Sequence, residues 1–321
     1  MFRDLKRIFL KKVKKRGGFV NCHAHFDRAF TINGQNLRLS QKLLKEKWAL
    51  VDEIKRESTQ LDFEARIEKA IKIMIKQGVK ICATFVDVDK ITGLKALRAA
   101  EKIKKKYKRE IKFLLINQTL KGVIEKEARY WLEKALEYVD IIGGLPSRDR
   151  PYEEKHLNIL CQYAKETGKM LHVHVGQENN PHEHDTELLA KKTIEYGLQG
   201  RVVAVHAISL AAQPPKTRKR VFQLMKKAKI GVICSPSAAL SMKQLPYKSY
   251  LHNSIAPVSE LLKEGIPVGL GVDNIADIYM PFGDGNLWTE TRMLMEACRY
   301  YEIDPLVDIA TTNGRKLLGI A

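Results

Sequence analysis

The sequence predicts an α/β protein, namely a closed (β/α)8 barrel of the TIM type, and three observations carry this prediction. Eight short apolar segments, each of strand length, recur along the 321 residues, and amphipathic stretches of helical periodicity separate them. This alternation is typical of right-handed βαβ units around a parallel sheet. No glycine-rich phosphate loop follows the first segment, which weakens the alternative of an open dinucleotide-binding sheet. No linker or low-complexity stretch divides the chain, so we expect a single barrel domain over residues 18–321.

Each expected strand is a short, mostly apolar run. The strands are expected at residues 18–25, 80–88, 111–118, 139–146, 170–176, 201–209, 229–237 and 266–274. Helical periodicity fills the intervals, and several of the helical stretches end on glycine, a frequent residue at helix C-termini. The helices are expected at residues 62–77, 93–108, 124–138, 152–167, 183–197, 215–228 and 256–264.

Residues 1–17 are expected to form a separate basic arm. The formal net charge of the chain is +19, and the first sixteen residues hold eight Lys or Arg against one Asp. Apolar residues recur there at helical spacing, at Phe2, Leu5, Ile8 or Phe9, and Val13. We favour an amphipathic helix whose apolar stripe covers one end of the barrel. The alternative is an arm for nucleic acid or an anionic membrane, but no nucleic-acid recognition motif occurs elsewhere in the sequence.

Composition narrows the class of protein. A hydrophobic content of 45% and a charged content of 29% describe a globular chain. The longest apolar runs have strand length, so no membrane span is expected, and no signal-peptide pattern follows the basic N-terminus. Five scattered cysteines suit free thiols in a reducing compartment. We therefore expect a cytoplasmic protein that acts on a small molecule, with homo-oligomerisation left open.

Four histidines and one aspartate are expected near the catalytic face of the barrel. His23 and His25 stand two apart on the first expected strand, so their side chains share its inward face. His174, His206 and Asp273 come late in the fifth, sixth and eighth strands, and those ends form the catalytic face of TIM barrels. The histidine pair alone could be structural. The five residues together indicate a site for zinc or iron.

The chain resembles the amidohydrolase superfamily, and most closely its cytosine deaminase-like branch, through five motifs in order. They are "NCHAHFDRAF", "INQTLKG", "LHVHVGQ", "AVHAISL" and "GLGVDNIADIYMPFGDGNL". The resemblance implies one divalent metal ion, zinc or iron, held by His23, His25, His174 and Asp273. It also implies that His206 lies beside the metal-bound water and that Asp273 takes a proton from that water. Relatives usually carry a small β-sandwich as well, and we expect this barrel to lack it.

The expected roles of several other residues rest on the same resemblance or on their positions along the chain. Gln118 matches a glutamine on the third strand that orients the substrate. The fourth strand carries no lysine that could be carboxylated to bridge two metals, which favours a single ion. His172 lies one layer deeper than His174, so we expect it in the core or behind the ligands. Asn180 and Pro181 are expected to start a helix at the mouth, with His182 and His184 exposed on its first turn.

Two departures from the deaminase pattern affect the choice of reaction. Gln177 stands where deaminases of this branch keep a glutamate that shuttles a proton, and an amide cannot exchange that proton at neutral pH. Gln177 is therefore expected to hold the substrate, with the neighbouring Glu178 as an alternative shuttle. Asn274 follows Asp273 where cytosine deaminases carry a second aspartate, so cytosine itself is not the expected substrate.

Together these patterns predict a metal-dependent hydrolase that cleaves a C–N bond in a small nitrogenous compound, which we expect to be heterocyclic. Asp273, His206 and Gln177 are the expected catalytic residues. The expected substrate-binding residues are Asp27, Asp87, Gln118, Asn274 and Tyr279. Deamination is the favoured reaction, and amide or cyclic-amide hydrolysis is second because Gln177 replaces the shuttle. The competing class is a non-catalytic barrel with a basic nucleic-acid-binding arm.

Overall fold

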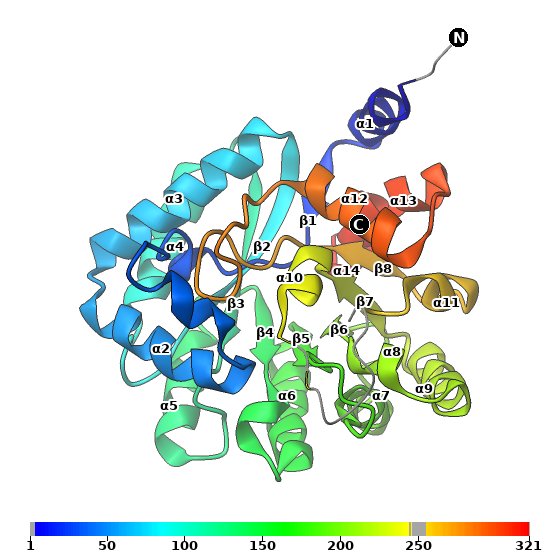
Figure 1. Ribbon diagram of the computed structural model, residues 1–321. Coiled ribbons are helices and arrows are strands. Elements are labelled where there is room, and N and C mark those ends of the chain that lie inside the picture. Colours follow the sequence, from blue (N-terminus) through cyan, green and yellow to red (C-terminus); the bar gives the residue numbers. More distant parts are fainter. Residues whose placement is uncertain (1–3, 244, 246–254, 321) are drawn as a thin grey trace.

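Eight parallel strands form a barrel in the computed structural model, which describes residues 4–243, 245 and 255–320 (Figure 1). The strands follow one another around the sheet in chain order. They are β1 (Phe19–Asn21), β2 (Val79–Asp87), β3 (Lys112–Gln118), β4 (Ile141–Gly144), β5 (Met170–Val175), β6 (Val202–His206), β7 (Gly231–Cys234) and β8 (Val268–Leu270). The Cys22 amide donates to the Leu270 carbonyl at 2.8 Å, which joins the last strand to the first. The predicted (β/α)8 barrel is confirmed.

Helices surround the strands, and each of the seven predicted between strands is present with its ends displaced by at most three residues. They are α3 (Gln60–Lys76), α4 (Lys95–Lys106), α5 (Lys126–Ala135), α6 (Glu153–Thr167), α7 (Asp185–Glu195), α9 (Pro215–Ala228) and α11 (Val258–Lys263). Further short elements are η1 (Phe26–Arg28), η2 (Leu37–Gln41), η3 (Pro146–Asp149), α8 (Ser209–Ala212), α10 (Pro236–Ser241), α12 (Leu287–Cys298), α13 (Ile303–Ala310) and α14 (Thr312–Leu317). None of the described helices is long and apolar enough to cross a membrane.

The core has two layers because successive strand residues point to opposite faces. On β2, Cys82 and Val86 pack outward against the helices, whereas Ala83 and Phe85 fill the barrel interior. Leu317 of α14 joins the interior cluster, and a side chain added at Gly231, the first residue of β7, would meet it. The end of the barrel where the strands begin is therefore filled by α14, which leaves the other end for the site.

The basic N-terminal segment folds as helix α1 (Leu5–Lys15), beside α12 and α13 in Figure 1. Phe9 and Val13 are buried, and the Phe9 ring lies 5.5 Å from the Trp288 ring. The predicted amphipathic helix is thus present, with its apolar stripe against the barrel's outer helices. Leu5 was expected in that stripe but is 63% exposed, because the helix has only begun there. Phe2 lies outside the described residues.

Helix α2 (Leu44–Glu57), blue in Figure 1, covers the mouth of the barrel and was not predicted. Its Leu44, Trp48 and Val51 form a separate apolar cluster with Leu120 and Leu145, which follow β3 and β4. A helix that buries its apolar side on the loops after the strands closes the catalytic end of the barrel.

Candidate active site

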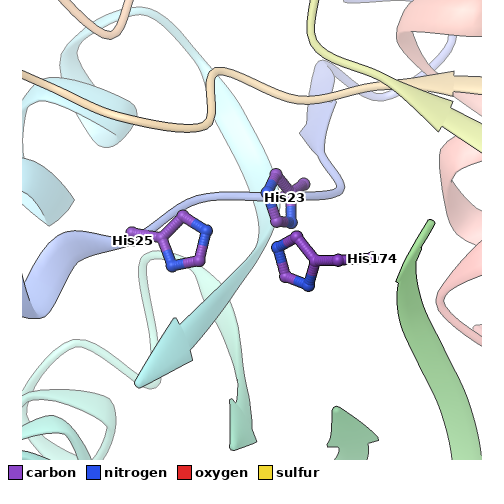
Figure 2. Close-up of side chains that lie close together, drawn as sticks. All are labelled: His23, His25 and His174. Atoms are coloured by element: carbon purple, nitrogen blue, oxygen red, sulfur yellow. The ribbon is translucent and has the colours of Figure 1, made fainter. Parts of the chain in front are cut away.

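Three histidine side chains from two strands point toward one another at the mouth end of the barrel (Figure 2). His23 and His25 follow β1, and their ring centroids lie 4.9 Å apart at right angles. His174 lies on β5, with its ring centroid 4.9 Å from that of His23 and 5.5 Å from that of His25. The shared inward face predicted for the histidine pair is confirmed.

Asp273 and His206 complete the cluster. Asp273 Oδ1 lies 3.4 Å from His23 Nε2 and 3.4 Å from His25 Nε2, and Asp273 Oδ2 lies 3.7 Å from His206 Nε2. The ligand atoms of His23, His25 and His174 all lie within 4.8 Å of one another, as do those of His23, His206 and Asp273. The structure therefore brings together all five residues that the sequence singled out.

The backbone at two of these positions is strained. His206 has φ +75° and Asp273 has φ +59°, although neither is a glycine. Such conformations cost about 1–3 kcal/mol and concentrate at functional sites. At Asp273 the conformation is held by its amide, which donates to the His23 carbonyl at 3.0 Å. Gly271 allows this approach, since an added Cβ would lie 2.7 Å from His23 Cβ.

The cluster suits a divalent metal ion because buried imidazole nitrogens in it have no other partner. Both ring nitrogens of His23, Nδ1 of His25 and Nε2 of His174 make no hydrogen bond within the described residues. His174 Nδ1 lies 3.3 Å from the Gly144 carbonyl, a bond that requires the proton on Nδ1 and leaves Nε2 free for an ion. Imidazole nitrogens with one carboxylate form a donor set for zinc or iron.

Burial also keeps His25 and His206 in the neutral form that binds metal. It is the largest cause that lowers the pKa of His206, to about 4. Burial, followed by the charges of Arg28 and the neighbouring histidines, holds the pKa of His25 well below its usual value. Asp273 is buried too, which by itself raises its pKa, but His23 and His206 outweigh this and lower it. Neutral histidines beside an ionised carboxylate are the protonation states that a metal requires.

A cavity opens over the cluster. Its polar wall includes four residues that the sequence proposed, namely Gln118, Gln177, Asn274 and Tyr279. The side-chain oxygens of Gln118, Gln177 and Tyr279 are buried and have no hydrogen-bond partner among the described residues, so each is free to meet a ligand. The Asn274 amide donates to Asp277. Glu178 lines an adjacent hollow instead of this cavity.

Asp27 and Asp87 lie behind the cavity wall and do not line the cavity itself. Asp27 Oδ2 accepts from the Asp87 amide at 2.9 Å. Asp87 is 3.1 Å from Lys55 Nζ and 3.5 Å from Arg28 Nη1. Burial raises the pKa of Asp27 to about 7, and the charge of Asp87 adds to this effect. Asp87 holds Arg28, which does line the cavity.

Among the lining residues that sequence reasoning missed are Arg28, Lys47 and Trp48. Arg28 stands inside the motif that carries the histidine pair, and its place three residues after His25 was the available signal. Lys47 and Trp48 lie on α2, where apolar residues recur at helical spacing. Nothing in that spacing says that the helix folds over the mouth.

His172, His182 and His184 lie outside the metal-ligand cluster. His172 is buried, and its Nε2 lies 2.9 Å from the Leu317 carbonyl, so it is the core histidine that was predicted. His182 and His184 are exposed, also as predicted. The predicted helix start at Asn180 is wrong, because the Asn180 side chain accepts from the His182 amide in a turn and α7 begins at Asp185.

Known proteins share this fold and much of this sequence. An uncharacterized protein of Haemophilus influenzae is 42% identical over 266 residues, which cover 82% of this chain and 96% of that protein. The N-isopropylammelide isopropyl amidohydrolase of Pseudomonas sp. is 27% identical over 314 residues, covering 94% of this chain and 74% of that enzyme. The crystal structure of 5-methylcytosine deaminase from Klebsiella pneumoniae with phosphonocytosine superposes with a TM-score of 0.87 at 25% identity, over 94% of this chain and 75% of that one.

The family assignment rests on nearly the whole chain. Residues 17–321 match the sequence model of the amidohydrolase family. This match covers the barrel and every residue of the histidine–aspartate cluster. The chain therefore belongs to the amidohydrolase family and is a hydrolase of carbon–nitrogen bonds.

Proposed function

We propose that the protein is a metal-dependent deaminase of a small amino-substituted heterocycle. The observation that carries this proposal is the cluster of four histidines and Asp273 at the floor of a small cavity whose wall offers unpaired amide and phenol oxygens. His23, His25, His174 and Asp273 would hold one zinc or iron ion. When bound, such an ion supplies an acidified water and polarises the carbon under attack.

Asp273 would carry out the proton transfers. Its carboxylate lies in the middle of the cluster, within 3.7 Å of three imidazoles. Asp273 would take the two protons of the attacking water in turn. It would give one to the ring nitrogen as the water oxygen bonds to carbon, and the other to the amino nitrogen, which leaves as ammonia as the carbonyl forms. His206 would donate a hydrogen bond to the oxygen that develops negative charge.

The amide side chains of the cavity wall would bind and orient the substrate ring. Gln118 and Gln177 line the cavity and have buried oxygens without a partner, so each can accept from a ring N–H or amino group. Asn274 and Tyr279 line the same cavity. Asp27 and Asp87 would act on the substrate indirectly, through Arg28.

Hydrolysis of a substituted amine or cyclic amide is the second candidate. It is favoured by Gln177, because a carboxamide cannot return a proton to a ring nitrogen as a glutamate does. One relative, 27% identical, is named as an isopropyl amidohydrolase. In that reaction the leaving group would be an alkylamine and not ammonia.

Two measurements on the purified chain test these proposals. Metal analysis is expected to find one zinc or iron per chain, removable by a chelator. A screen of amino-substituted purines, pyrimidines, pterins and triazines, read by ammonia release, is expected to identify a substrate. A folded protein that retains no divalent ion in any buffer and releases neither ammonia nor alkylamine would contradict both candidates and favour a non-catalytic barrel.

A further inference from the structure

Lys47 is a cation in the cavity wall with no carboxylate of the described residues in direct contact, and the negative charge that acts on it, that of Asp277, lies beyond ion-pair distance. It lies on α2, its side chain lines the cavity, and the residue is 2% exposed. No carboxylate within the described residues lies within 4 Å of its ammonium, and it makes no hydrogen bond there. The contact it does make is with the face of the Tyr279 ring, whose centroid lies 5.9 Å from Nζ.

Lys55, two turns further along the same helix, shows the usual arrangement. It is also 2% exposed, but its Nζ lies 2.6 Å from Asp89 and 3.1 Å from Asp87. Buried charges in proteins are normally paired in this way, because removing an ion from water costs free energy that only a partner offsets. Lys47 has only the more distant charge of Asp277 to offset that cost, and burial lowers the pKa of its ammonium.

The other ionisable groups of the cavity do not supply the missing charge. Arg28 is already held by Asp87 and Asp277, each at 3.5 Å. Asp273 is engaged with the histidines of the cluster. The remaining polar lining is neutral, so within the described residues no group of the cavity wall pairs directly with Lys47.

We propose that Lys47 binds a negatively charged oxo group of the substrate, so that the enzyme selects acidic, oxo-substituted heterocycles in their anionic form. This inference rests on the proposed function and specifies its substrate class. A ring that carries three oxo groups readily loses a ring proton, and its anion spreads the negative charge over the carbonyl oxygens. Such an anion provides a charge-assisted hydrogen-bond partner for the ammonium. Trp48 and Tyr279 line the same cavity and suit a flat ring.

Binding of two rings that lack an amino group tests this selection without catalysis. Barbiturate is an anion at neutral pH, uracil is neutral, and both are planar six-membered rings. Calorimetry on the metal-loaded chain is expected to show barbiturate binding at least ~10-fold more tightly than uracil. Equal affinity for the two rings, or tighter binding of uracil, would overturn the proposal.

Variants of Lys47 assign the selection to this side chain. Lys47→Met is expected to weaken barbiturate binding about 10- to 100-fold and to change uracil binding less than about threefold. Lys47→Arg is expected to restore most of the preference. Arg56→Met is the matched control, because it removes one positive charge from an exposed position of the same helix. If Lys47→Met left the preference intact, or if Arg56→Met abolished it equally, the proposal would be wrong.

Stability separates a binding role from a structural one. Lys47→Met removes an unpaired buried cation, so its melting temperature is expected to equal or exceed that of the wild type. A clear fall would show that Lys47 supports the fold and would count against the proposal. Metal content and ammonia release on the same preparations keep the two claims apart. Ammonia release without barbiturate preference refutes only the inference, whereas barbiturate preference without bound metal supports the anion site and refutes the proposed metal-dependent deaminase.

Discussion

Asp273 and His23 are joined twice, once by backbone and once by side chain. The Asp273 amide donates to the His23 carbonyl at 3.0 Å, and Asp273 Oδ1 lies 3.4 Å from His23 Nε2. The first contact links the segment after β8 to the segment after β1. The second places the carboxylate among the imidazoles. The contacts that close the barrel therefore also assemble the cluster, and a change at either residue is expected to affect both.

Asp273→Asn is expected to fold, to retain metal poorly and to lose about 10²–10⁴-fold in kcat, because an amide keeps the shape of the residue but cannot accept the water's proton. Metal analysis and turnover on the substrate found by the ammonia screen measure these effects. The control is Asp304→Asn. Asp304, on α13, forms an exposed ion pair with Lys12 of α1, and such a pair contributes little to stability. An Asp273→Asn protein with full metal content and more than a tenth of wild-type turnover would argue against this role.

Gln177→Ala is expected to cost about 1–3 kcal/mol of transition-state binding, the range for a lost polar partner in a buried site. The motivation is its place in the cavity wall with an unpaired oxygen. Gln177→Glu is not expected to improve turnover of the natural substrate, since it adds a negative charge near Asp273. The measurement is kcat/KM for each variant.

Glu178→Gln asks whether the neighbouring carboxylate is the proton shuttle instead. Glu178 lines an adjacent hollow, and burial raises the pKa of its carboxyl. We expect Glu178→Gln to retain activity within about threefold, because a group outside the cavity does not act as its general base. A loss of ~100-fold or more with Gln177→Ala nearly silent would exchange the roles of the two residues.

The residues that the sequence predicted correctly share a physical reason. Strand ends carry His174, His206 and Asp273, and in a parallel barrel all strand ends meet at one mouth, so order along the chain suffices to bring them together. Gln118 pairs in register with Asp87 at the last position of β3 and β2, yet only Gln118 reaches the cavity. The direction of a side chain at the rim depends on local contacts that periodicity does not encode.

The position of helix α2 at the mouth could not be predicted from the sequence for the same reason. The apolar side of α2 packs on Leu120 and Leu145, residues that lie about 70 and 95 positions further along the chain. Helical spacing predicts that such a face is buried, but it does not name the surface that buries it. Lys47 and Trp48 entered the site only through that packing.

Phe9→Ala is expected to destabilise the protein by about 3–5 kcal/mol, because Phe9 is fully buried between α1 and the barrel's outer helices. Leu5→Ala on the same helix is the matched control and is expected to change little, since Leu5 is 63% exposed. Thermal or urea unfolding measures both.

The same helix tests the nucleic-acid alternative. If α1 serves only to cover the barrel, deleting residues 2–16 lowers the melting temperature and leaves the salt dependence of any nucleic-acid binding unchanged. If α1 is instead an arm for nucleic acid, the same deletion leaves the stability unchanged and flattens the slope of log nucleic-acid affinity against log salt concentration. We expect the first result, and the second would reverse the assignment of this segment.

Glu290 on α12 gives the protein a predictable dependence of stability on pH. Burial raises the pKa of its carboxyl to about 8, and its Oε2 accepts from the Ser237 amide at 2.9 Å. Because the folded-state pKa lies above the unfolded value of about 4.3, the folded chain binds one more proton between these two pH values. The contribution of this group to the free energy of unfolding is therefore full at low pH and falls as pH rises toward 8, by up to a few kcal/mol.

Glu290→Gln keeps the shape of the side chain and a hydrogen-bond acceptor, but it cannot ionise. Urea unfolding from pH 5 to pH 8 is expected to show a smaller loss of stability in Glu290→Gln than in the wild type. Parallel curves for the two proteins would mean that Glu290 is ionised in the folded state throughout this range.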